Sequence, residues 1–263
     1  MKELKKIVLP ALLISLTTSQ AFSEEASDIN LAAAQTGKLA PPNDGALILG
    51  MSLTSNYIIG GNTQTNNKPA FQPFIEYNAP QGYYLGAWGS SGICDCAHTP
   101  YGLYKVDENE YEYDIYVGYR ARLTERLNVD LNAWRFAYDD TGHFGNTLNA
   151  KVNYRLTPKF DLGLLVKYYT NFDNTLLSQQ ASYALSEQWR VSGAYEGWTQ
   201  SKTTGAISQD SSDRNWNVGI SKQLDRAWSL DVRAYGANFA DVWTGEDETR
   251  YVMTVTAITD LLH

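Results

Sequence analysis

The sequence is poor in the residues on which most enzyme and metal chemistry depends. Its 263 residues include only two cysteines and three histidines, and 21 basic residues face 29 acidic ones. The net charge of −8 argues against nucleic acid as a partner, because neutralising phosphates needs a basic face. No apolar run reaches the roughly 20 residues that a membrane-spanning helix needs. Helical membrane proteins and nucleic-acid-binding proteins are therefore both disfavoured.

The two cysteines lie close together as Cys94-Asp95-Cys96, and His98 follows two residues later. These side chains offer three metal ligands, but the spacing differs from the usual zinc pattern and no second ligand pair follows. The alternative is a strained local disulfide between Cys94 and Cys96 in an oxidising compartment. We favour the disulfide, or an inert pair, and expect no metal and no other cofactor.

The three histidines, His98, His143 and His263, are the candidate general bases. His143 follows Asp139 and Asp140 in an expected loop, so an Asp–His pair is conceivable there. Solvated loop residues are the commoner interpretation, and the sequence has no G-x-S-x-G motif. An outer-membrane hydrolase is thus the least favoured function, and we assign no catalytic residue.

The first residues carry an export signal. Residues 1–6 form a basic region with three lysines, residues 7–16 are a short apolar stretch, and Ala21 and Ser23 are the small residues at the −3 and −1 positions of a cleavage site before Glu24. This arrangement predicts a signal peptide over 1–23. A polar, Ala-rich segment over 24–44 is expected to be flexible, and the remaining 45–263 form the folded part.

From residue 45 onward, short segments alternate between apolar and polar residues, as strands with one apolar face do. In residues 111–122, for example, the odd positions are mostly apolar and the even positions mostly polar. The phase changes within residues 127–138, which predicts a β-bulge near Ala133. Twelve strands are predicted, at 45–57, 70–78, 82–90, 110–122, 127–138, 146–156, 160–169, 175–185, 189–198, 213–224, 228–237 and 249–259.

Short and long connections alternate between these segments. The short ones are 80–81, 124–126, 157–159, 186–188 and 225–227. The longer, polar ones are 58–69, 91–109, 139–145, 170–174, 199–212 and 238–248. Short periplasmic turns and longer external loops are typical of a barrel that spans the outer membrane. The pattern predicts an all-β fold: a closed, antiparallel, up-and-down transmembrane β-barrel of about 12 strands, in the cell outer membrane after export.

Aromatic residues cluster at the expected strand ends, where the two interfacial girdles of such a barrel lie. The first set flanks the short turns: Tyr77, Tyr83, Tyr154, Phe160, Trp189 and Trp228. The second set lies near the long loops: Tyr57, Tyr111, Phe136, Tyr168, Trp198, Trp216 and Tyr251.

Closure of the sheet turns the apolar residues toward outer-membrane lipid and the polar ones toward the lumen. The candidate pore-lining residues are Glu112, Asp114, Arg120, Arg122, Lys151, Arg155, Lys167, Arg190, Glu196, Asp231 and Arg233. A charged wall of this kind favours a porin-like passive channel for small polar solutes. The alternative is a non-conducting barrel filled by internal ion pairs, which presents its long loops to a partner. The oligomeric state is left open.

Three blocks of sequence resemble a known family. They are residues 52–57 with Gln64, 68–70 and Gln72; residues 82–90; and residues 112–119. The chain resembles the Gcw_chp family, a porin-like group of proteobacterial outer-membrane proteins of unknown function. The resemblance implies a barrel and an outer-membrane location, and no catalytic or substrate-binding residue. One departure is Gly60-Gly61, which stands where the family tends to have Arg-Gly.

Overall fold

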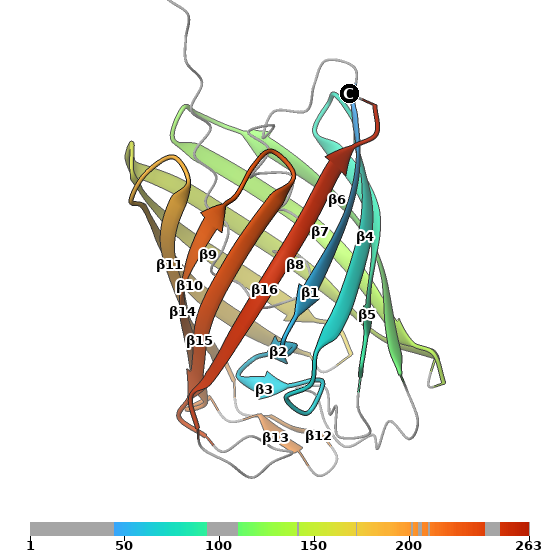
Figure 1. The fold of residues 1–263 in the computed structure, drawn as a ribbon. Helices are drawn as coiled ribbons and strands as arrows, with labels where there is room; N and C mark the ends of the chain where they lie inside the picture. The colour runs from blue at the N-terminus through green and yellow to red at the C-terminus, as the bar shows by residue number, and fades with distance from the viewer. Residues whose placement is uncertain are drawn as a thin grey trace, which may run out of the picture.

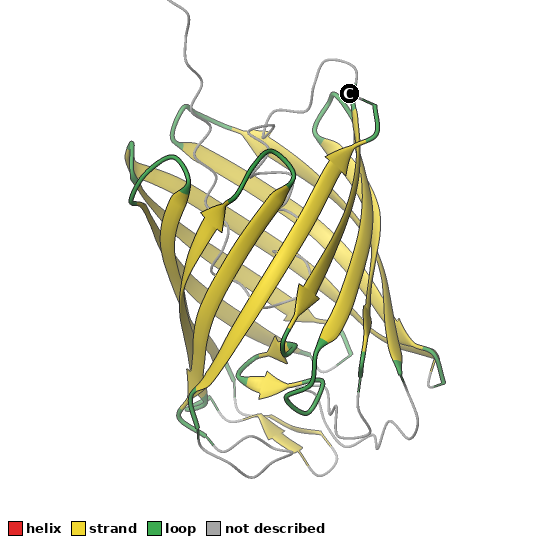
Figure 2. Ribbon diagram, viewed as in Figure 1, coloured by secondary structure: helices red, strands yellow, loops and turns green. Residues whose placement is uncertain are grey.

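The computed structural model describes residues 45–93, 110–140, 142–171, 173–200, 202–204, 207–209, 211–239 and 248–262. The predicted signal peptide (1–23), the segment 24–44, the pair Cys94 and Cys96, His98 and His263 lie outside the described residues. Twelve strands form one closed antiparallel barrel, in the order β1-β16-β15-β14-β11-β10-β9-β8-β7-β6-β5-β4 (Figures 1 and 2).

The described residues contain no helix that is both long and apolar enough to cross a membrane.

The barrel strands match the predicted segments closely. Their bounds are β1 Ala46–Thr54, β4 Ala70–Asn78, β5 Tyr83–Ser91, β6 Tyr111–Arg122, β7 Leu127–Tyr138, β8 Gly142–Thr157, β9 Phe160–Tyr169, β10 Asn174–Ala184, β11 Trp189–Trp198, β14 Arg214–Gln223, β15 Trp228–Ala237 and β16 Arg250–Asp260. Two small hairpins lie outside the barrel sheet: β2 Ile58–Ile59 with β3 Asn62–Thr63, and β12 Lys202–Thr204 with β13 Ile207–Gln209.

The side chains of each barrel strand alternate between the outer and inner faces. On β6, Ile115 and Val117 are 61% and 57% exposed, whereas the intervening acidic and aromatic side chains are buried. Burying charge inward and exposing aliphatic groups outward is unfavourable in water, but it is what a barrel surrounded by lipid requires. The predicted fold class, a closed transmembrane β-barrel, is confirmed.

The two rims differ in their connections. The short-turn rim, at the top of Figure 1, carries the tight turns, the start of β1 and the end of β16. The opposite, long-loop rim carries the long connections 55–69, 92–110, 199–213 and 238–249. Two connections at that rim are tight, however, at 139–141 and 170–173. The prediction of six long loops was therefore wrong for two. Strand β8 begins four residues earlier than predicted and extends the β7–β8 hairpin, and β10 begins one residue earlier, at Asn174.

The tight turns are stabilised by one recurring device. In four of them a Ser, Thr or Asp side chain accepts hydrogen bonds from the backbone amides two and three residues later, as turn residues of these types do. The four residues are Thr124, Thr157, Ser186 and Asp225. At Asp225 the amides of Ala227 and Trp228 hold the pKa of the carboxyl below its usual value.

The predicted bulge near Ala133 was wrong. Strands β7 and β8 stay in register through Ala133, and the shift comes between Phe136 and Ala137. The even positions of β7 point inward throughout. The apparent change of phase arises because the inner face itself changes from polar, at Asp130, to aromatic, at Trp134.

The girdle near the short turns is confirmed. Tyr77, Tyr83, Tyr154, Trp189 and Trp228 are exposed on the outer face, and Phe160 lies partly exposed on the same face. At the long-loop rim, Tyr111, Tyr168, Trp216 and Tyr251 also point outward. Tyr57, Phe136 and Trp198 do not belong to this girdle, since they pack inside the barrel. For these three rings, contacts inside the barrel are more favourable than a position at the membrane interface.

Candidate functional site: the barrel interior

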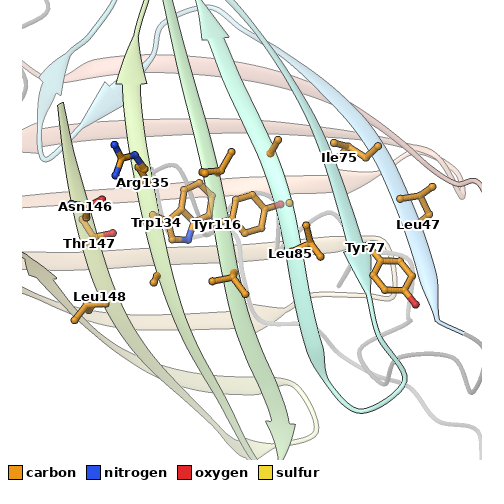
Figure 3. A pocket seen from close by; sticks show the side chains of 15 residues that line it. Leu47, Ile75, Tyr77, Leu85, Tyr116, Trp134, Arg135, Asn146, Thr147 and Leu148 are labelled. Carbon is orange, nitrogen blue, oxygen red and sulfur yellow. The ribbon is translucent and has the colours of Figure 1, made fainter. Parts of the chain in front are cut away.

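One side of the interior is packed with aromatic side chains. Tyr116 of β6 stacks on Trp134 of β7, with ring centroids 4.1 Å apart and planes inclined by 7° (Figure 3). Tyr84 of β5 lies beside Tyr116, at a centroid distance of 6.0 Å. These rings belong to one hydrophobic cluster that also includes residues of β1, β4 and β16. Strands β4 to β7 therefore carry a packed layer on their inner face.

Large inward side chains lie flat over glycines on the neighbouring strand. A Cβ added at Gly50 would lie 2.2 Å from the ring of Phe74, its direct cross-strand partner. The same arrangement pairs Gly86 with Tyr116, Gly118 with Tyr84, Gly145 with Phe136, Gly163 with Gln180 and Gly219 with Arg233. Each glycine removes the side chain that would push its partner toward the barrel axis. The pairs therefore keep bulky groups against the wall.

The glycine pairing makes a stability prediction. In Gly50→Val the new side chain takes the place of the Phe74 ring, so overpacking should lower the free energy of unfolding by about 1–3 kcal/mol. Adding Phe74→Ala should recover part of that loss, because it vacates the space. Urea unfolding of both variants in detergent measures the coupling. A double variant whose loss equals or exceeds the sum of the single losses would contradict the pairing.

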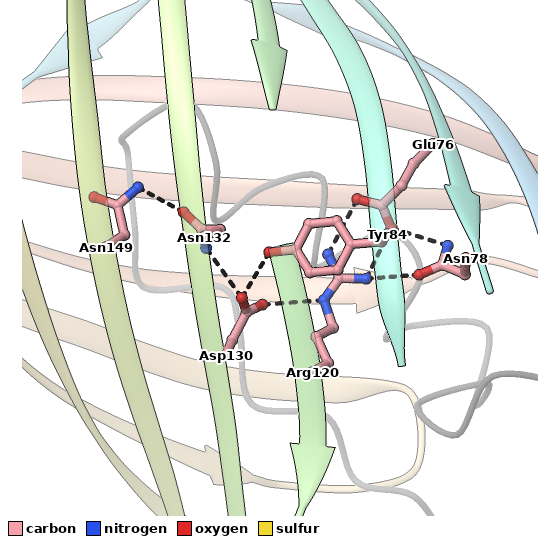
Figure 4. A network of polar contacts seen from close by, with 7 residues as sticks. All are labelled: Glu76, Asn78, Tyr84, Arg120, Asp130, Asn132 and Asn149. Atoms are coloured by element: carbon pink, nitrogen blue, oxygen red, sulfur yellow. Dashed lines mark hydrogen bonds and ion pairs between the residues drawn. The ribbon is translucent and has the colours of Figure 1, made fainter. Parts of the chain in front are cut away.

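Arg120 is the centre of a charged network near the short-turn rim (Figure 4). Its guanidinium donates Nη1 and Nη2 to the two carboxylate oxygens of Glu76, at 2.8 and 3.0 Å. Its Nε donates to Asp130 Oδ2 at 3.0 Å, while the hydroxyl of Tyr84 donates to Asp130 Oδ1 at 2.6 Å. The guanidinium also lies over the Tyr84 ring, 3.6 Å from its centroid. This bidentate, stacked geometry suits arginine and no other cation.

Two smaller clusters repeat the pattern on the other strands. Asp161 of β9 lies between Arg155, at 3.2 Å, and Arg190, at 3.6 Å. On β15, Arg233 pairs with Asp231 at 3.1 Å. Arg233 also donates to the side chains of Asn217 and Ser192, at 2.7 and 3.0 Å. The inner wall is thus crossed by ion pairs rather than by a ring of one charge.

All eleven candidate pore-lining residues lie on the inner face of their strands. Arg122 is exposed at the short-turn rim, and the side chains of Arg120, Arg155, Arg190 and Asp231 are partly exposed. The others are buried: Glu112, Asp114, Lys151, Lys167, Glu196 and Arg233.

Charges of the two signs balance on the inner face of the described strands. Sequence reasoning did not place Arg250 and Asp260, which also lie on this face. The inward cations are Arg120, Arg122, Lys151, Arg155, Lys167, Arg190, Arg233 and Arg250. As many carboxylates accompany them: Glu76, Glu112, Asp114, Asp130, Asp161, Glu196, Asp231 and Asp260.

Inward side chains are buried in both halves of the barrel. In the short-turn half the buried ones include Glu76 of β4, Asp161 of β9 and Ser182 of β10. In the long-loop half they include Glu196 of β11. On β7, Asn128 and Asn132 are partly exposed, but Asp130 between them is buried. Burial of the inner wall therefore does not distinguish the two halves.

The β1–β4 connection, residues 55–69, crosses the mouth of the barrel at the long-loop rim. At one side its Tyr57 packs on Trp88 of β5, with ring centroids 5.7 Å apart. At the other side Arg250 Nη1 of β16 donates to the carbonyl of Gly61 at 3.3 Å. A Cβ at Gly61 would lie 3.1 Å from the Cβ of Asn215 on β14. We call residues 55–69 the mouth loop.

Buried hydrogen bonds fix the mouth loop. Thr63 Oγ1 and Thr65 Oγ1 both donate to Asn56 Oδ1, at 2.6 and 3.0 Å. The side-chain Nδ2 of Asn56 donates to Asn67 Oδ1 at 2.8 Å. Gly61 has a φ of +87°, which only glycine adopts readily. Sequence reasoning took this segment for an ordinary external loop, although its Asn, Thr and Gly-Gly composition was a signal for a tight fold.

The pairing of His143 with an acid is not supported. His143 is exposed and points outward from β8, opposite Ala137. The carboxylate of Asp139 accepts hydrogen bonds from the backbone amides of Glu110 and Tyr111, so it caps the start of β6. No group of three or more potential metal ligands comes together within the described residues.

Solved structures with a similar fold are porins and outer-membrane channels. The KdgM porin has a TM-score of 0.54 at 11% identity, covering 81% of this chain and 98% of that one. A KdgM structure in complex with disordered oligogalacturonate has a TM-score of 0.52, with the same identity and coverage. The COG4313 outer membrane channel from Pseudomonas putida F1 is less similar, with a TM-score of 0.48 at 10% identity over 86% of this chain and 98% of that one. At 11% identity the likeness to the KdgM porin establishes the fold alone.

A search of curated proteins finds no match to the sequence. The Gcw_chp family, described as a bacterial protein of unknown function, matches residues 42–262. The match extends from the N-terminal blocks through the last strand of the barrel. The chain therefore belongs to the Gcw_chp family.

Proposed function

We propose that this protein is a porin-like passive channel for small polar solutes in the outer membrane. The observation that carries the proposal is the inner wall, where ion pairs, amides and hydroxyls line every side of a closed barrel. A barrel that serves only as an anchor has no need to hold its bulky inner side chains flat against the wall. The glycine pairs, such as Gly86 with Tyr116, do this on several strands.

The charge balance of the wall bears on the solute. Rings of one sign select ions of the opposite sign, and the described inner face has as many carboxylates as cations. A balanced wall favours uncharged or zwitterionic polar solutes over strongly charged ones. The KdgM porin, whose fold is similar, has been solved in complex with disordered oligogalacturonate. Because that ligand is an anionic oligomer, the example supports a polar ligand for a barrel of this fold but not the charge preference proposed for this chain.

The mouth loop makes the long-loop rim the narrowest part of the proposed path. In an outer-membrane barrel the short turns face the periplasm and the long loops face the cell exterior. The burial of many inward side chains in both halves of the barrel favours a second candidate, a non-conducting barrel that displays these loops. The two candidates differ in whether the mouth loop leaves a water path.

Planar bilayer recordings separate the two candidates. Purified, folded protein should give single-channel steps in KCl, and the reversal potential in a salt gradient should lie near zero because the wall is charge-balanced. Arg233→Gln, which removes one inward cation, should shift the reversal potential toward cation preference. A bilayer that stays silent with folded protein would support the non-conducting barrel. A strongly ion-selective wild type would contradict the balanced wall.

A further inference from the structure

The outer face of the barrel carries an exposed cation. Arg135 of β7 is exposed and points away from the lumen. Its cross-strand neighbours are Ile115 of β6 and Asn146 of β8. None of the ion pairs within the described residues involves Arg135. An unpaired arginine on a lipid-facing wall is costly near the bilayer centre and tolerated near the interface.

Polar groups gather beside Arg135 at the same outer surface. The side-chain amide of Asn146 points outward, and its backbone rather than its side chain makes the hydrogen bonds to Asn171 and Thr170. His143, further toward the long-loop rim on β8, is also exposed outward. Guanidinium, amide and imidazole groups are the donors that bind phosphate oxygens.

An apolar groove adjoins this polar group (Figure 3). It is an open groove of about 780 Å³ along β1 and β4 to β8, and Arg135 and Asn146 lie at its end on β7 and β8. The small side chains of Ala87 and Ala133 contribute to its lining. Larger aliphatic residues such as Leu85, Val117 and Leu148 also line it. The groove has the apolar lining that an acyl chain needs, and a cationic end.

We infer that Arg135, Asn146 and His143 form a binding site for the phosphate of a lipid A-type glycolipid whose acyl chain lies in this groove. The charge of Arg135 is complementary to a lipid phosphate at the membrane interface, because acyl chains offer no charge to pair with it. The choice of glycolipid rests on the proposed outer-membrane orientation, because the site lies toward the long-loop rim and so faces the outer leaflet. A cationic side chain beside an anionic lipid surface strengthens binding about fivefold.

Native mass spectrometry of the full barrel in detergent tests this site. The wild type should retain bisphosphorylated lipid A in preference to its dephosphorylated form and to phosphatidylglycerol. Arg135→Gln should weaken retention of the bisphosphorylated form about fivefold and leave the dephosphorylated form unchanged. Arg214→Gln is the matched control, since Arg214 points outward on β14 but donates to the carbonyls of Ser211 and Asp213.

Four results would overturn the inference. The first three are equal retention of the two lipid A forms, retention of phosphatidylglycerol equal to that of bisphosphorylated lipid A, and an Arg135→Gln variant that binds like the wild type. An equal loss in Arg214→Gln would show general charge rather than a site, and would overturn it too. The assay needs no current through the barrel. A silent bilayer recording would therefore refute the channel and leave the lipid site unaffected. Failure of the lipid-binding test would likewise leave the channel unaffected.

Discussion

Replacing residues 57–66 of the mouth loop by a Gly-Ser-Gly linker should raise single-channel conductance several-fold. The loop spans the interior between Trp88 and Asn215, so its removal takes several buried side chains out of the narrowest section. The ends of β1 and β4 are paired at Thr54 and Ala70, so a short linker can join them. Planar bilayer recordings in KCl give the measurement.

A point variant in the same loop provides the control. Asn66 is exposed and has a φ of +50°, so Asn66→Gly keeps the loop and relieves its backbone. Its conductance should match that of the wild type. If the linker variant passed no more current than the wild type, the mouth loop would not be the constriction.

Arg120→Met should lower the free energy of unfolding by about 3–5 kcal/mol, the usual cost of leaving buried charges without their partner. Glu76 is only 1% exposed, and Asp130 would keep only neutral hydrogen-bond donors. Urea unfolding in detergent, followed by tryptophan fluorescence, measures the change.

Two further variants show whether unpaired buried charge causes the loss of stability in Arg120→Met. Arg122 lies on the same face of β6 but is exposed at the rim. Arg122→Met should therefore change the free energy of unfolding by no more than about 0.5 kcal/mol. A triple variant with Glu76→Gln, Asp130→Asn and Arg120→Met should recover most of the lost stability, because no buried charge is left uncompensated. If Arg120→Met and Arg122→Met lowered the free energy of unfolding equally, the Arg120 network would not be what stabilises this side of the interior.

The strand pattern was predictable because it is local. A period of two within each segment defines both the strand and its outer face, and turn residues such as Thr157 and Asp225 mark the ends. The same period placed the charged residues of β6 and β8 on the inner face. The start of β8 was missed because residues 142–145 contain glycine and histidine, which gave no alternation.

The arrangement of the interior depends on pairs far apart in the sequence. Nothing near Gly118 indicates that Tyr84 lies over it, since the cross-strand register brings the two together. For the same reason Tyr57 and Trp198 were assigned to the membrane interface when they pack inside. The mouth loop was missed because its contacts, to Trp88 and to Arg250, lie in strands at opposite ends of the chain.

The central claim is that polar side chains face water inside the barrel and apolar ones face lipid outside. Cysteine labelling along β7 tests it most directly, in a background with Cys94→Ser and Cys96→Ser and with protein in lipid vesicles. With a membrane-impermeant maleimide on both sides, Asn128→Cys and Asn132→Cys should react, because these positions are inward and partly exposed. Val129→Cys and Leu131→Cys should be protected by lipid. The reverse pattern, or equal labelling of all four, would contradict the account.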